Sequence, residues 1–204
     1  MTKTISRLYN NYGDARAAVR QLEAAGVPHS DISVIASNAE NWYQDGKDTY
    51  PDRDNDGRDD RVEGAETGAA IGAGVGGAAG LLAGLGLMAI PGVGPVVAAG
   101  WLVSTLAGAA AGAATGGALG ALTQAGISDE DAHVYAEGLR RGGAVVSARV
   151  ADEDASRLQS MMDRSSVKLP ERAAAYRKSG WKTFDPNATP YTADQVKKER
   201  SLYM

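Results

Sequence analysis

The sequence predicts an α+β protein in which a small α/β domain is interrupted by a long helical hairpin rich in glycine and alanine. Three observations lead to this prediction. Residues 3–37 follow a β-α-β pattern, residues 67–128 carry no charged side chain, and residues 129–172 return to an α/β pattern. We expect five parts: residues 1–37 and 127–170 as two halves of one domain, 38–66 as an acidic linker, 67–126 as the hairpin and 171–204 as a C-terminal tail.

The first half of the domain begins with a strand pattern, because side chains alternate in character from Thr4 to Tyr9. Apolar residues at helical spacing then follow Asp14, which is the expected N-cap, and end at Gly26, which is the expected helix stop. Residues 32–36 are largely apolar and predict a second, buried strand.

The linker contains an acidic loop, residues 52–63, that fits the calcium-loop pattern D-x-[DN]-x-[DN]-G-x5-E. Calcium prefers many oxygen ligands at short range, and Gly57 supplies the sharp turn that such a loop needs. However, Asp59 stands where an apolar residue is usual, and no helix pattern precedes the loop, so a solvated acidic linker is the alternative. The candidate ligands are Asp52, Asp54, Asp56, Arg58 through its carbonyl, Asp60 and Glu63.

The uncharged run is interrupted by Pro91-Gly92-Val93-Gly94-Pro95, which predicts a tight turn because two prolines and two glycines cannot continue a helix. The first half of the run, Thr67–Met88, would measure about 33 Å as a helix, which is long enough to cross a bilayer. The second half, Val96–Gln124, is longer. Trp101 is a candidate anchor at the membrane interface, with a simple packing role as the alternative.

Glycine recurs every fourth residue in both halves of this run, and we call the two series the glycine ladder. Within a helix in water each glycine costs about 1 kcal/mol relative to alanine, whereas in a packed interface it lets neighbouring backbones approach closely. The pattern therefore predicts a glycine-zipper hairpin in a membrane, or alternatively a buried core inside a soluble oligomer or a low-complexity segment. The ladder consists of Gly64, Gly68, Gly72, Gly76, Gly80 and Gly84, and of Gly100, Ser104, Gly108, Gly112, Gly116 and Gly120.

The second half of the domain predicts a helix after Ser128, a strand over residues 144–150 and a further helix over residues 154–163. Val167–Leu169 is a candidate short strand. The tail mixes aromatic and polar residues and contains one short capped helix, Thr192–Arg200, so we expect it to lie along the domain surface.

Composition excludes several classes of protein. The chain of 204 residues has no cysteine and two histidines, which excludes a disulfide framework, a thiolate zinc site and a histidine-rich metal site. The formal net charge of −4 argues against a nucleic-acid partner. No nucleophile motif, Walker motif or small-molecule site assembles, so no catalytic residue is assigned and we expect no enzyme activity. The start, MTKTISRLYNN, lacks an apolar segment of the kind found in signal peptides, so we expect a cytoplasmic N-terminus.

The order of these segments resembles the bacterial general stress protein family, of the heat-induced type, in the version with a glycine-zipper insertion. The resemblance covers residues 3–170 and is carried by LAGLGLMAIPGVGPVVAAGWL and DAHVYAEGLRRGGAVVSARV, and the tail around Ser179-Gly180-Trp181 is also similar. It implies a role in the stress response and a split ferredoxin-like domain. It implies no catalytic residues.

The expected function is that of a non-enzymatic stress protein that self-associates through the hairpin. We expect the hairpin to lie in or on the inner membrane, in contact with lipid, with the α/β domain in the cytoplasm. One alternative is a cytoplasmic homo-oligomer whose hairpins form an apolar core that holds lipid. Another is a calcium-responsive binding module, in which Ca²⁺ orders the loop of residues 52–63.

Overall fold

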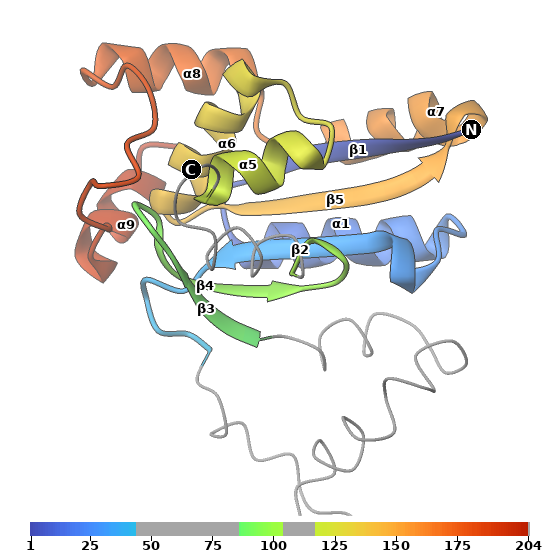
Figure 1. Ribbon diagram of the computed structural model, residues 1–204, viewed down its shortest axis with the longest axis horizontal. Coiled ribbons are helices and arrows are strands. Elements are labelled where there is room, and N and C mark those ends of the chain that lie inside the picture. The colour runs from blue at the N-terminus through green and yellow to red at the C-terminus, as the bar shows by residue number, and fades with distance from the viewer. Residues whose placement is uncertain (44–85, 104–116, 204) are drawn as a thin grey trace, which may run out of the picture.

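The computed structural model describes residues 1–43, 86–103 and 117–203. These residues form a five-stranded sheet in which every neighbouring pair is antiparallel (Figure 1). The mixed α/β class predicted from the sequence is confirmed. The strands, in their order across the sheet, are β1 (Thr2–Tyr9), β5 (Ala144–Ala151), β2 (Ile32–Ser37), β4 (Gly94–Ala99) and β3 (Gly86–Ile90).

The two predicted halves of the domain share this sheet. Along the chain, α1 (Tyr12–Ala24) lies between β1 and β2. In the sheet, β5 lies between these two strands and pairs with β1 from Thr2 to Tyr9 and with β2 from Ile32 to Ala36. One strand inserted between the two strands of a β-α-β unit is the arrangement called split βαβ. The chain must therefore bring segments more than 100 residues apart into contact before this sheet is complete.

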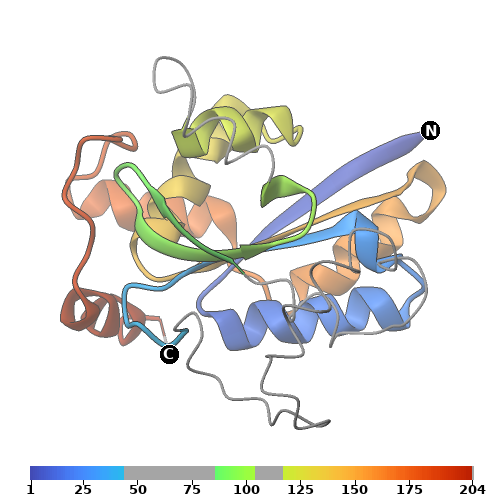
Figure 2. The same ribbon diagram turned by 60° about the horizontal axis from the view of Figure 1, so that its bottom comes forward.

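Helices cover both faces of the sheet (Figure 2). On one face, α1 and α7 (Asp152–Asp163) pack on a cluster that contains Ile5, Val34 and Val146. On the other face, α5 (Gly117–Gln124) and α6 (Asp129–Arg140) pack on a cluster that contains Leu8 and Val145. Successive side chains of β1 and β5 point to opposite faces of the sheet, so neighbouring residues of one strand belong to different core clusters.

The centre of the uncharged run is β-structure, so the prediction of a helical hairpin over residues 67–126 is wrong for residues 86–99. The turn at residues 91–93 does reverse the chain as predicted, but it joins β3 to β4. A short apolar run does not by its periodicity distinguish a buried strand from a helix, and here β4 pairs with β2 from Val34 to Ser37. Residues 67–85 and 104–116 of the predicted hairpin lie outside the described residues.

None of the helices that the structure describes is both long enough and apolar enough to span a membrane. Of the second half of the glycine ladder, Gly120 lies in α5, whereas Gly100 has a φ of +90° and follows β4. A helical position for Gly100 is therefore wrong. Its missing side chain instead lets the backbone pass close to Ser33.

The helix ends show which local predictions hold. Asn11 is the N-cap of α1, and its Oδ1 accepts a hydrogen bond from the backbone N–H of Asp14 at 2.9 Å, so the assignment of Asp14 as the cap is wrong. Ser128 is confirmed as the N-cap of α6. The predicted strand Val167–Leu169 is also wrong, because Leu169 begins α8 (Leu169–Lys178), where Pro170 favours a first helical turn.

The C-terminal tail contains α8 and α9 (Ala193–Arg200), and the capping box at Thr192 and Gln195 confirms the predicted short helix. The tail lies on the domain, as expected. A 3-10 turn at His29–Asp31 leads into β2.

Candidate functional site

β3 is the outermost strand of the described sheet, and we call its unpaired side the β3 edge. Gly86, Leu87 and Ala89 are exposed, with Leu87 40% accessible, whereas Ile90 is buried. Natural edge strands usually carry lysine, proline or a bulge that prevents pairing with another chain, and β3 contains neither lysine nor proline. Among the described residues, β3 therefore lacks the lysine or proline that would oppose pairing with a further strand.

The C-terminal part of the chain lies against the turn between β3 and β4. We call residues 181–203 the C-terminal strap. At Gly92 (φ +74°) a Cβ atom would lie 2.6 Å from the carbonyl oxygen of Asp185, and at Gly94 (φ +101°) it would lie 2.7 Å from Cβ of Pro190. Only glycine allows both the turn conformation and this close approach of the strap.

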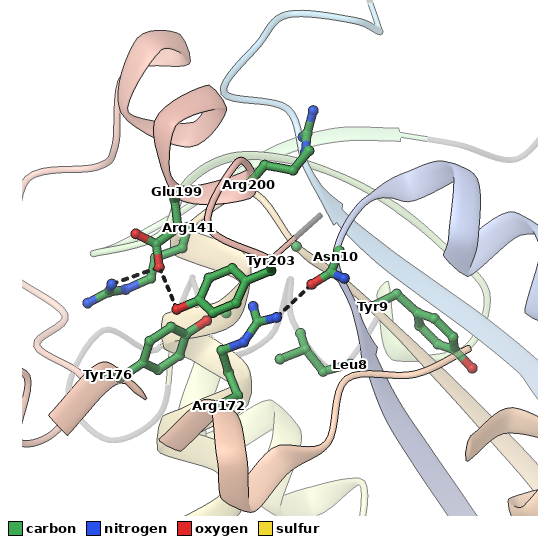
Figure 3. Close-up of a pocket in the computed structure, with 11 residues that line it drawn as sticks. Leu8, Tyr9, Asn10, Arg141, Arg172, Tyr176, Glu199, Arg200 and Tyr203 are labelled. Atoms are coloured by element: carbon green, nitrogen blue, oxygen red, sulfur yellow. Dashed lines mark hydrogen bonds and ion pairs between the residues drawn. The ribbon is translucent and has the colours of Figure 1, made fainter. Parts of the chain in front are cut away.

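At its far end the strap completes a group of charged and aromatic side chains, which we call the arginine–tyrosine cluster (Figure 3). Arg141, at the end of α6, donates from Nη1 to Oε1 of Glu199 in α9 at 2.9 Å. Arg172 of α8 lies over the ring of Tyr203 at 3.6 Å and donates to Oδ1 of Asn10 at 2.7 Å. Side chains from the β1–α1 connection and three helices therefore meet around the end of the strap.

The buried carboxylate of Glu137 anchors this cluster. Its side chain is 1% exposed, and its Oε1 accepts hydrogen bonds from Arg140 at 2.7 Å and from Arg141 at 2.6 Å. Burial lowers the pKa of Arg141, but the hydrogen bonds from Glu137 and Glu199 outweigh this effect, so its pKa lies above the ordinary value. Arg141 is charged at every physiological pH and keeps α6 and α9 linked.

The side chains of the arginine–tyrosine cluster fit a structural contact between elements better than a catalytic site. Its cavity measures about 10 Å³, which is at the lower limit for one water molecule. Burial raises the pKa of Tyr176 to about 12, so this hydroxyl is protonated at neutral pH. The lining contains no cysteine, serine, threonine or histidine that could act as a nucleophile or as a base near neutral pH.

The residues predicted for metal binding and helix packing lie mainly elsewhere in the chain. The proposed calcium ligands Asp52, Asp54, Asp56, Arg58, Asp60 and Glu63 lie outside the described residues, as do Gly64, Gly68, Gly72, Gly76, Gly80, Gly84, Ser104, Gly108, Gly112 and Gly116. In the part that is described, no three His, Asp or Glu side chains converge as a metal site would require. The calcium loop and this part of the glycine ladder therefore stay predictions.

Trp101 and the two histidines of the chain, His29 and His133, each contact a neighbouring side chain within the domain. Trp101 is half-buried, and Arg149 of β5 lies over its ring at 3.9 Å. His29 lies 3.1 Å from Glu23, and His133 is in contact with Thr183 at 2.9 Å. The residues that sequence reasoning missed are those of the arginine–tyrosine cluster, since Arg141 and Glu199 are 58 positions apart. The only local signal was the Arg140-Arg141 pair before two glycines.

Comparisons of the chain with protein-family models, with curated proteins and with solved structures found no match. The β3 edge and the C-terminal strap are therefore interpreted from their own geometry.

Proposed function

We propose that this protein is a non-enzymatic general stress protein that self-associates through its uncharged segment, in or on the inner membrane, with its α/β domain in the cytoplasm. The observation that supports self-association best is the β3 edge, which is exposed, free of charge and unpaired within the described residues. The stress role and the split ferredoxin-like classification rest on the resemblance of the sequence alone.

Strand addition is the mode of association that suits this edge. A second β3 would supply main-chain hydrogen bonds, and the exposed side chains of Leu87 and Ala89 would gain cross-strand neighbours. These two residues alternate with Met88 and Ile90, which pack on the domain core. The outward pair is therefore available to a partner without any loss of packing inside the domain.

The glycine ladder on either side of β3 and β4 supplies the second part of the proposal. Its four-residue spacing suits close packing of further copies, and the apolar side chains between the glycines suit lipid. The soluble-particle alternative is favoured by one observation: residues 86–99, at the centre of the uncharged run, belong to the domain sheet. Lipid would then be held between domains.

Two matched variants test the role of the β3 edge. Ala89→Lys places a charge in the exposed part of β3, and Ala174→Lys places the same charge on the exposed surface of α8. A charge on an edge strand opposes pairing with a second chain. We expect Ala89→Lys to shift the full-length protein toward monomers in light-scattering measurements, and Ala174→Lys to behave as the unmodified chain does.

An unchanged distribution of oligomers in Ala89→Lys would refute association through β3. The membrane part is tested separately, by alkaline carbonate extraction of membranes from native cells. Retention of the protein in the extracted membrane supports insertion. Recovery as a large soluble particle would contradict it and support the particle alternative.

A further inference from the structure

We propose that the C-terminal strap is a releasable restraint on the β3–β4 hairpin, and that its release lets the hairpin separate from β2, so that strand surface beyond the already exposed β3 edge becomes available for self-association. This inference rests on the proposed function, because it concerns the regulation of the same edge. The strap is fixed at two ends, one against the hairpin turn and the other against α6 and the segment after β2.

The contact with the hairpin is apolar and close. Phe184 is 3% exposed and belongs to the same core cluster as Ile90 and Val93, so the strap shares the hydrophobic core of the hairpin turn. A Cβ atom at Gly92 would lie 2.9 Å from the Phe184 ring, which shows how little space separates the two segments. If the strap moves away, the hairpin turn loses this cover.

The contact at the other end is mainly ionic. In α9 only Val196 is buried, whereas α1 buries four apolar residues. The charged contacts at this end of the strap include Arg141 with Glu199 at 2.9 Å, Arg200 with Glu40 at 2.6 Å and Arg172 over the ring of Tyr203 at 3.6 Å. An element with few buried apolar contacts opens at a lower free energy than the core.

The β3–β4 hairpin joins the rest of the sheet through fewer residue pairs than β1, the strand at the opposite edge, does. β4 pairs with β2 over four residue pairs, whereas β1 and β5 pair over eight. Near the β3–β4 turn, the hairpin has a further contact in addition to those with the strap. The backbone N–H of Asn38 donates a hydrogen bond to the carbonyl oxygen of Pro95 at 2.8 Å. Loss of the strap therefore leaves the hairpin with its short pairing to β2 and with the core contacts of β4, and an opening of the hairpin from β2 would expose the edges of β2 and β4.

The pair Arg200 and Glu40 allows a test with its own rescue. Arg200→Glu places two carboxylates together and should release α9. The double variant Glu40→Arg/Arg200→Glu restores opposite charges. Hydrogen exchange of the full-length chain, followed by mass spectrometry, reports residues 193–203, residues 86–99 and the β1–β5 pair separately. We expect Arg200→Glu to accelerate exchange in residues 86–99 by about tenfold, within the range known for coupled contacts.

Three outcomes separate the inference from the proposed function. Faster exchange in both α9 and the hairpin, reversed in the double variant and absent from the β1–β5 pair, supports the restraint. Faster exchange in α9 alone overturns it. If the hairpin responds as expected but Arg200→Glu assembles no faster than the double variant in light scattering, the restraint holds and self-association through β3 fails.

Discussion

Replacing Gly100 with alanine tests the position of the uncharged run in the sheet. In a helix that packs against no neighbour this substitution would stabilise the chain by about 1 kcal/mol, because alanine is the better helix former. In the structure Gly100 has a φ of +90°, and a Cβ atom there would overlap the carbonyl oxygen of Ile32 and lie 2.5 Å from Oγ of Ser33. An unpacked helix and the observed turn therefore predict effects of opposite sign.

Three contributions determine the expected loss of stability. A left-handed conformation costs an L-residue about 1–2 kcal/mol, and forcing backbone atoms apart costs about 1–3 kcal/mol. The shift also weakens the hydrogen bond from the Leu102 N–H to Oγ of Ser33 at 2.9 Å, which contributes about 1 kcal/mol. We expect a total loss of about 4 kcal/mol in the free energy of unfolding, or about 8–16 °C in Tm for a chain of this length.

Gly26→Ala is the matched control for Gly100→Ala. Gly26 has a φ of +93°, but a Cβ atom there would have nothing within 4 Å, so this variant measures the conformational cost alone. Urea denaturation of both variants, followed by circular dichroism, should give a loss for Gly100→Ala that exceeds the control by about 3 kcal/mol. Equal losses, or a stabilised Gly100→Ala, would refute the β-hairpin position of this residue.

Three further predictions concern single side chains. Glu137→Gln should lower the free energy of unfolding by about 3 kcal/mol in urea, because it removes the buried carboxylate charge that Arg140 and Arg141 share. Burial raises the pKa of Tyr135 to about 12 from 10.0, so the native state holds a proton that the unfolded chain loses from about pH 10 upward. Stability should therefore fall above pH 10, and Tyr135→Phe should fall less steeply over that range. Isothermal titration of the full chain should show one Ca²⁺ site that Asp54→Ala removes, and a chain that releases no binding heat would contradict the calcium loop.

The sequence predicted the elements whose signals are local. The strand at residues 144–150, the cap at Ser128 and the helix after Thr192 each depend on a few neighbouring residues, and all three are confirmed. The β3–β4 hairpin was mistaken for helix because its partner is β2, and nothing near residues 86–99 reveals that pairing. Four-residue glycine spacing also concealed that Gly100 serves a close backbone approach.

The candidate site was less predictable than the fold. Exposure of the β3 edge follows from the strand order, which depends on contacts between distant segments. The strap depends on Gly92 and Gly94 meeting Asp185 and Pro190, about 95 positions away. The two prolines and two glycines predict the turn. The local sequence does not show that Gly92 and Gly94 also allow the strap to approach the turn closely.

The strand order also has a consequence for biosynthesis. β5 lies between β1 and β2, yet the chain must grow by 107 residues (144 minus 37) from the end of β2 before β5 begins. At roughly 5–20 residues per second, the first two strands wait for about 5–20 s without their common partner. The uncharged segment leaves the ribosome during this interval, before the domain that holds its ends can close. A nascent chain of this protein therefore presents its most apolar part before the domain is complete, at a stage when chaperones or a membrane surface can reach it.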